Sequence, residues 1–361
     1  MRQVLKLEDS FSTVRVCAAI FCLLLIVGCV ISPRRTVGGG GTPTPTPSPT
    51  PTPNPSATGK LYVSNAGANS ILRFDNAFTT GGNVSPAATI SGVNTTLNAP
   101  AFITLDAIAD RLYVANNGDL SILIFDNIST KTGNIAPDRT IFGVSTTLTT
   151  PTDVALDRGR NLLYVADNID IHVFTSASTA TGNIAPARNI GASFAVSAIF
   201  IDAANDRLYA ADQAGNAIHV YDSASTLNGT VSANRIVQGA ATHLAGPGGL
   251  QVDGAGRLVV SNGSPGSITL YANAAIANGN IAPAAEIIGS NTGFSVPDQI
   301  VMNTSGTGTL YNADPGAARI AIFANFSTTN GNVAPTRSIF GVSTTLTAGG
   351  QPVGVALDNT R

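Results

Sequence analysis

The chain has 361 residues and a formal net charge of -2, and only 11% of its residues are charged, against roughly 25% in average domains. No basic block follows the N-terminal segment, which argues against nucleic acid as a partner. The three cysteines, Cys17, Cys22 and Cys29, all lie near the N-terminus, so the rest of the chain offers no disulfide, cysteine nucleophile or thiolate metal site.

Residues 1–28 predict a signal peptide. Basic residues precede an apolar run over residues 16–27, which is shorter than the roughly 20 residues of a membrane-spanning helix. The run ends in LIVGC at residues 25–29, which resembles the lipobox of bacterial lipoproteins. The resemblance implies lipidation of Cys29, a membrane anchor at that residue and an extracytoplasmic location on the outer membrane or cell surface. An ordinary secretory signal is the alternative.

Residues 29–58 predict a flexible linker rich in Gly, Thr and Pro. Proline alternates with Thr or Ser over residues 42–53, which forbids a helix and favours an extended polyproline II spacer. Such Thr/Pro stalks are also typical O-glycosylation sites.

From residue 60 onward, one pattern recurs at intervals of 45 to 52 residues. Each of the six copies opens with a short β-prone run such as Arg111–Asn116, which ends in Asn or Asp and predicts a strand. The terminal residues are Asn65, Asn116, Asp167, Asp212, Asn262 and Asp314. Because every copy has this residue, a shared turn-capping role explains it better than a single active site does.

A second strand follows in each copy, with isoleucine at its first position and an aromatic residue at its fourth, as in residues 122–125. Its second position varies and includes His172 and His219, which predicts a surface position. A Gly-Asn turn that ends in Pro leads to a third strand. The fourth strand, as in residues 152–157, alternates apolar residues with period two and again ends in Asp or Asn.

Four short strands per unit, repeated six times, predict an all-β fold, a six-bladed β-propeller of four-stranded blades over residues 59–361. An open β-solenoid is the rival architecture. Residues 352–361 form a fourth strand with no first strand after it, so we expect it to be the innermost strand of the first blade, where it closes the ring and covers a sheet edge. The pattern resembles NHL-repeat propellers, which include both enzymes and binding platforms.

The loops after the first strand and before the fourth strand are expected at one mouth of the central channel. They are rich in Thr, Asn and Gly, and their side chains would suit a protein or glycan ligand. A metal-dependent hydrolase or lactonase similar to the gluconolactonase propellers would need several oxygen ligands there. The candidates are Asp153, Asp298 and His243, which is few for a metal site, and no cofactor or metal is expected.

The sequence therefore predicts a monomeric, non-enzymatic binding module for a protein, glycan or envelope component. Two alternatives remain open: the hydrolase that uses Asp153, Asp298 and His243, or a passive cell-surface structural protein.

Overall fold

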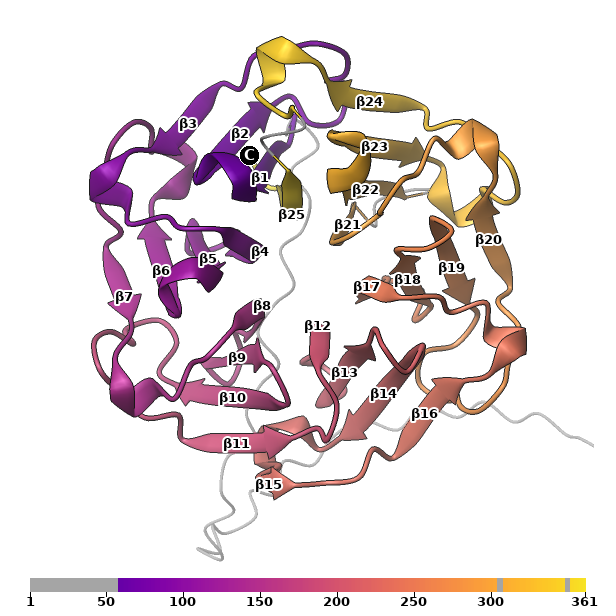
Figure 1. Ribbon diagram of the computed structural model, residues 1–361, viewed down its shortest axis with the longest axis horizontal. Helices are drawn as coiled ribbons and strands as arrows, with labels where there is room; N and C mark the ends of the chain where they lie inside the picture. Colours follow the sequence, from indigo (N-terminus) through magenta and orange to yellow (C-terminus); the bar gives the residue numbers. More distant parts are fainter. Residues whose placement is uncertain (1–57, 304–307, 348–350) are drawn as a thin grey trace, which may run out of the picture. The chain divides into compact units, whose positions relative to one another are not determined.

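A computed structural model describes residues 58–303, 308–347 and 351–361, which form a ring of six β-sheets (Figure 1). The predicted six-bladed propeller is confirmed. The predicted signal peptide, Cys29 and linker as far as residue 57 lie outside the described residues. Within the described ranges, no helix is long and apolar enough to cross a membrane.

Each blade has four antiparallel strands, which run in chain order from the innermost strand to the outermost, except that the last strand of the chain opens the first blade. Blade 1 consists of β25 (Pro352–Asp358), β1 (Lys60–Asn65), β2 (Ser70–Asp75) and β3 (Ala88–Ser91). Blade 2 consists of β4 (Pro100–Asp106), β5 (Arg111–Asn116), β6 (Ser121–Asp126) and β7 (Arg139–Ile141). Blade 3 consists of β8 (Pro151–Asp157), β9 (Leu162–Asp167), β10 (Asp170–Thr175) and β11 (Arg188–Gly191). Blade 4 consists of β12 (Val196–Asp202), β13 (Arg207–Asp212), β14 (Ala217–Asp222) and β16 (Arg235–Gln238). Blade 5 consists of β17 (Pro247–Val252), β18 (Leu258–Asn262), β19 (Ser267–Tyr271) and β20 (Ala285–Ile288). Blade 6 consists of β21 (Ile300–Asn303), β22 (Thr309–Asp314), β23 (Arg319–Ala324) and β24 (Arg337–Phe340).

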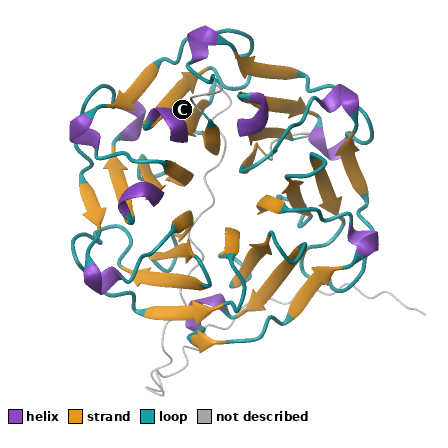
Figure 2. Ribbon diagram, in the orientation of Figure 1, coloured by secondary structure: helices purple, strands orange, loops and turns teal. Residues whose placement is uncertain are grey.

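Short 3₁₀ turns connect the strands (Figure 2). Those after the second strand of a blade are η1 (Ala66–Ala68), η3 (Asn117–Asp119) and η9 (Pro315–Ala317). Those after the third strand are η4 (Ile128–Thr130), η6 (Ala224–Thr226) and η10 (Phe326–Thr328). Those after the outermost strand are η2 (Val93–Thr95), η5 (Val144–Thr146), η7 (Ala240–Thr242), η8 (Ser290–Thr292) and η11 (Val342–Thr344).

The C-terminal strand closes the ring as predicted. β25 pairs antiparallel with β1, with Lys60 opposite Asp358 and Val63 opposite Val355. The two ends of the propeller also meet, because the backbone N–H of Gly59 donates to the carbonyl of Arg361 at 3.0 Å. The edge of β1 is thus covered by the far end of the same chain, which removes an exposed pairing edge.

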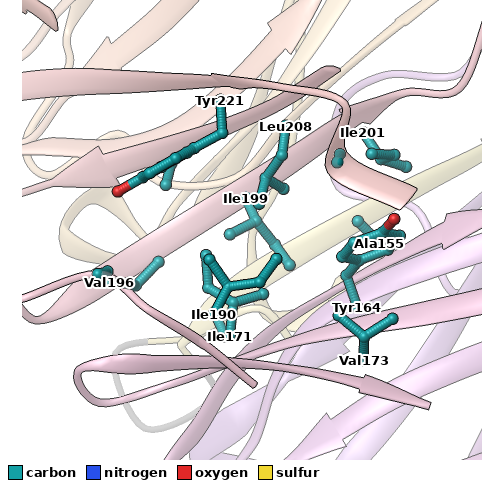
Figure 3. Close-up of a cluster of buried hydrophobic side chains, with 14 of the residues drawn as sticks. Ala155, Tyr164, Ile171, Val173, Ile190, Val196, Ile199, Ile201, Leu208 and Tyr221 are labelled. Atoms are coloured by element: carbon teal, nitrogen blue, oxygen red, sulfur yellow. The ribbon is translucent and has the colours of Figure 1, made fainter. Parts of the chain in front are cut away.

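The hydrophobic core is divided among the six interfaces between neighbouring blades. Figure 3 shows the cluster between blades 3 and 4, where Tyr164 and Ile171 pack with Ile199 and Leu208. The tyrosine of the Leu-Tyr-Val strand also bonds across such an interface, as when the Tyr113 hydroxyl donates to the Ala177 carbonyl at 3.2 Å. The repeated aromatic positions are therefore inter-blade contacts.

The prediction that His172 and His219 lie at the surface is wrong. His172 is 2% exposed, and His219 is partly buried and stacks on Phe194 with 4.1 Å between ring centroids. An alternation of period two marks a solvated position only in a sheet that exposes one of its faces to solvent. Here neighbouring blades cover both faces of the third strand of each blade, which is the second strand of each sequence repeat. Its variable positions are therefore buried or partly buried as well.

The Gly-Asn turn of one blade clasps the outer edge of the blade before it. Gly133 donates its N–H to Thr89 at 2.7 Å and accepts from Ser91 at 3.2 Å, and Asn134 Oδ1 accepts from the N–H of Asn94 at 2.8 Å. The same asparagine bonds join Asn83 to Ser343, Asn183 to Ser145, Asn280 to Ala241 and Asn332 to Asn291. The deviating fourth copy instead inserts β15 (Gly229–Thr230), which pairs parallel with β11. These turns cover the outer edges that a propeller would otherwise expose.

We expect Asn134→Ala to lower the free energy of unfolding by about 1 kcal/mol, because it leaves the Asn94 N–H without its acceptor. Urea unfolding of the purified protein measures this. Asn94→Ala is the matched control, since the exposed Asn94 contributes only its backbone to the clasp. Equal losses in the two variants would show that the bond from Asn94 to the Asn134 side chain does not stabilise the ring.

Candidate functional site

One face of the ring carries the loops after the second strand of each blade and the loops before each innermost strand; we call it the loop face. The two loop sets bond to each other, as when Gly118 donates to Asn98 at 2.9 Å and Asn98 donates to the Asn116 side chain at 2.8 Å. The opposite face carries the hairpins between the first two strands of each blade, and we call it the hairpin face. There the inner-strand acids cap the turns, as when Asp106 accepts from the N–H of Ala109 at 3.0 Å. The predicted turn-capping role thus holds for inner-strand acids such as Asp106. Among the residues that end the Leu-Tyr-Val strands, Asp212 and Asp314 cap the turn that follows them, whereas Asn65 and Asn116 make no such capping bond.

The central channel holds two cavities. The one on the loop face, of about 480 Å³, is lined by loop-face residues and by the first residues of the innermost strands. The other, of about 280 Å³, is lined by the later residues of the same strands, among them Thr104, Gln251 and Val301. Six equivalent positions lie at the level between them: Phe102, Asp153, Ala198, Gly249, Gln299 and Gly354.

Large and small side chains at these six positions complement each other across the channel. The Gln299 amide reaches two other blades: its Oε1 accepts from Val355 at 2.8 Å and from Ile103 at 3.3 Å, and its Nε2 donates to the Ile103 carbonyl at 3.2 Å. Phe102 of blade 2 packs with Ala198 and Leu250 of blades 4 and 5. Blades 2, 3 and 6 thus fill the channel between the two cavities, where blades 1, 4 and 5 carry Gly or Ala.

Asp153 serves the structure of this layer. Its two carboxylate oxygens accept from the N–H of Val154 at 2.7 Å and of Ile199, in the next blade, at 2.8 Å. Burial raises the pKa of Asp153 to about 8, although these two hydrogen bonds lower it. Both oxygens are thus committed to the backbone.

Asp298 lies at the start of blade 6, in the wall of the loop-face cavity. Its backbone is fixed, because its N–H donates to Ala313 at 2.7 Å and its carbonyl accepts from the Ser261 hydroxyl at 2.6 Å. Within the part of the chain that the structure describes, no hydrogen-bond donor reaches its carboxylate. Burial raises the pKa of Asp298 well above its usual value, and the charges of Asp153 and Asp314 add to this.

His243 lies apart from both acids. It follows η7 on the loop between the outermost strand of blade 4 and the innermost strand of blade 5, and its Nδ1 lies 2.8 Å from Oε2 of Glu286 in the outermost strand β20. Its side chain is 52% exposed. Of the predicted candidates, the structure thus places Asp153 and Asp298 at the channel, where the charge of Asp153 acts on Asp298, and leaves His243 next to the outermost strand of blade 5.

His172 takes part in a buried polar network that sequence reasoning missed. Its ring nitrogens lie 2.7 Å from Asn189 Oδ1 and 3.1 Å from Asp167 Oδ2. Burial disfavours its charged form, but the bonds to Asp167 and Asn189 outweigh burial and raise its pKa. Asp167 also accepts from the N–H groups of Thr149 and Thr150, so the network holds a loop of the loop face in place. In the described ranges, no three His, Cys, Asp or Glu side chains gather as a metal site would require.

The two channel acids predict an unusual pH dependence of stability. A native pKa raised above the unfolded value of about 4 means that the native state binds more protons than the unfolded state, so stability falls as pH rises from about 4 to 8. We expect Asp298→Asn to reduce this fall, because an amide at this position cannot ionise. Urea unfolding at pH 5 and pH 8 measures it. An equal loss of stability between pH 5 and pH 8 in the variant and in the unsubstituted protein would contradict a raised pKa of Asp298.

Comparisons with known proteins support the fold alone. No protein-family model matches the sequence, and no protein with a curated description matches it. A chain of the crystal structure of the nidogen/laminin complex superposes with a TM-score of 0.55 at 14% identity, over 83% of this chain and 98% of that chain. The hydrazine synthase of Kuenenia stuttgartiensis superposes with a TM-score of 0.46 at 17% identity, over 62% of this chain and 58% of that chain.

Proposed function

We propose that this protein is a lipid-anchored, extracytoplasmic propeller that acts as a monomer and binds a component of the envelope or surroundings, without catalysis, at its loop face. The observation that carries the proposal is the placement of the cavity relative to the chain ends. The loop-face cavity lies at the end of the channel where β1 finishes at Asn65, whereas Gly59 and Arg361 meet at the hairpin face, where β1 begins. A chain tethered through residues N-terminal to Gly59 would hold the loop face away from the tether.

Three further observations support this proposal. The N-terminal sequence ends its apolar run in the lipobox-like LIVGC. The loop-face cavity lies within the range of about 300–1,000 Å³ that is usual for ligand sites. The chain from the nidogen/laminin complex has the same architecture in a protein assembly.

The anchor is tested by mass spectrometry of the protein purified from its native membrane. We expect Cys29 to carry acyl chains at a new N-terminus, and Cys29→Ser to release the protein into the soluble fraction. An unmodified Cys29 in membrane-bound protein would contradict the anchor.

The binding face is tested with a pair of tryptophan substitutions. Ala214 is exposed at the mouth of the loop-face cavity, and Ala204 is exposed on the hairpin face. We expect Ala214→Trp to lower retention of the purified protein on isolated envelope fractions at least tenfold, and Ala204→Trp to leave it unchanged. Equal retention of both variants would exclude the loop face, and hydrolysis of a lactone panel with added Ca²⁺ or Zn²⁺ would favour the hydrolase.

A further inference from the structure

The loop-face cavity has an apolar body and a single ionisable group. Pro100, Phe102, Val196 and Val353 contribute apolar surface, while hydroxyl and amide groups supply the polar part, among them Thr150, Asn168, Ser197 and Gln213. Among the described lining residues Asp298 is the one ionisable side chain, and no lysine, arginine or histidine accompanies it. A ligand in this cavity therefore meets one carboxyl group in mostly apolar surroundings.

The carboxylates around Asp298 have hydrogen-bond partners, whereas among the described residues none reaches the carboxylate of Asp298 itself. Asp153 accepts from two backbone N–H groups. Asp314 accepts from the N–H groups of Ser295 and Val296 and lies 3.6 Å from the Arg319 guanidinium. The Arg319 guanidinium thus lies against Asp314, and the Asp298 carboxylate keeps its hydrogen-bonding capacity for the cavity.

The position of the Asp298 carboxylate depends on a glycine in the neighbouring blade. A Cβ atom at Gly248 would lie 2.9 Å from Oδ1 of Asp298. Gly248 also lines the cavity, so the absence of its side chain leaves the carboxylate room at the cavity wall.

An unpaired carboxylate in a shielded site is stabilised either by a proton or by a cation. A hard metal ion is poorly suited, because Ca²⁺ takes six to eight oxygen ligands and the described lining supplies one carboxylate. An ammonium group needs one carboxylate and a few hydroxyl or carbonyl acceptors, and an attached apolar body suits the rest of the lining.

We infer that the loop-face cavity binds a small organic cation, a primary ammonium group on an apolar body, with the Asp298 carboxylate as its counter-charge. The inference rests on the proposed binding function of the same face and names the ligand class. Because the cation competes with a proton for Asp298, the affinity for the cation should rise with pH. The neighbouring acids Asp153 and Asp314 oppose the ionisation of Asp298.

The test is calorimetric titration of the full-length purified protein with benzylammonium, and with benzyl alcohol as a neutral probe of similar shape. We expect benzylammonium to bind at least tenfold more tightly at pH 8 than at pH 5, and benzyl alcohol to show no such change. Asp298→Asn should weaken benzylammonium binding at least tenfold at pH 8. Asp119→Asn, which removes an exposed carboxylate from the same face, should leave it unchanged. Gly248→Ala should weaken binding by displacing the carboxylate.

Equal affinity of Asp298→Asn and the unsubstituted protein for benzylammonium would overturn the inference, as would tighter binding of Ca²⁺ alone. Circular dichroism and the melting temperature check that each variant is folded. If benzylammonium fails to bind while Ala214→Trp still abolishes envelope retention, the ligand class is wrong and the proposed function stands. If benzylammonium binds at Asp298 while Ala214→Trp retains envelope binding, the proposed function is wrong and the cation site stands.

Discussion

Removal of residues 352–361 is expected to abolish cooperative folding of the propeller. The deletion removes β25, which supplies the innermost strand of blade 1 and pairs along the whole of β1. It also removes Val355 and Ala356, which are buried in the two interfaces of blade 1, and the N–H that Gln299 accepts across the channel. The loss should approach the about 5–15 kcal/mol total stability of a typical domain, because the ring opens and the edge of β1 is exposed.

Thermal melting and limited proteolysis of the truncated protein measure this effect. A deletion of residues 359–361 is the matched control, since it keeps β25 and removes only the contacts of the last residues, such as the bond from Gly59 to Arg361. We expect the short deletion to lower the melting temperature by a few degrees and the long one to remove the transition. A cooperative transition in the long deletion, within a few degrees of the full chain, would exclude ring closure by β25.

Gly249→Val is expected to destabilise the protein by about 3 kcal/mol or more. Gly249 belongs to the layer that separates the two cavities, and a Cβ atom there would lie 2.8 Å from the Asp298 carbonyl oxygen and 2.8 Å from Cα of Gln299. Both contacts are with the backbone of the neighbouring blade. This backbone cannot move aside without shifting the inner strand β21 or the residues that directly precede it.

Gly159→Ala is the control for this substitution. Gly159 is exposed on the hairpin face, and the nearest atom that its Cβ would meet is Oδ1 of Asp157 at 3.6 Å, an ordinary contact. Urea unfolding should show little change for Gly159→Ala and a large loss for Gly249→Val. Similar stabilities would mean that the blades can separate at the channel without penalty.

The strand boundaries could be read from the sequence because they depend on local patterns. The Leu-Tyr-Val strand that ends at Asn116 and the inner strand that ends at Asp157 lie where the repeat placed them. Their terminal side chains cap turns or hold adjacent loops through bonds over about 20 residues or fewer. Position His172 was assigned wrongly because burial of both sheet faces depends on the neighbouring blades and leaves no signal in one strand.

The candidate site was only partly readable for the same reason. Asp153 and Asp298 stand out in the sequence as acids in a chain that has few, but nothing local distinguishes their roles. The structure separates them: Asp153 is held by a backbone N–H of the next blade, and Asp298 is left without a donor in the described chain. The roles of Phe102 and Gln299 were missed, although a signal exists, since their repeat position carries Gly or Ala in three other copies.

The sequence by itself determined the all-β class, the six blades and the strand that closes the ring, because strand period, turn residues and repeat spacing are local properties that recur six times. Only the tertiary structure decided how the channel is filled and where a charge is left unpaired. Those features depend on which side chains meet when the chain closes on itself, as Gln299 of blade 6 meets Ile103 of blade 2 across 196 positions of sequence. Contacts of that range are set by the curvature of the ring, which no single repeat encodes.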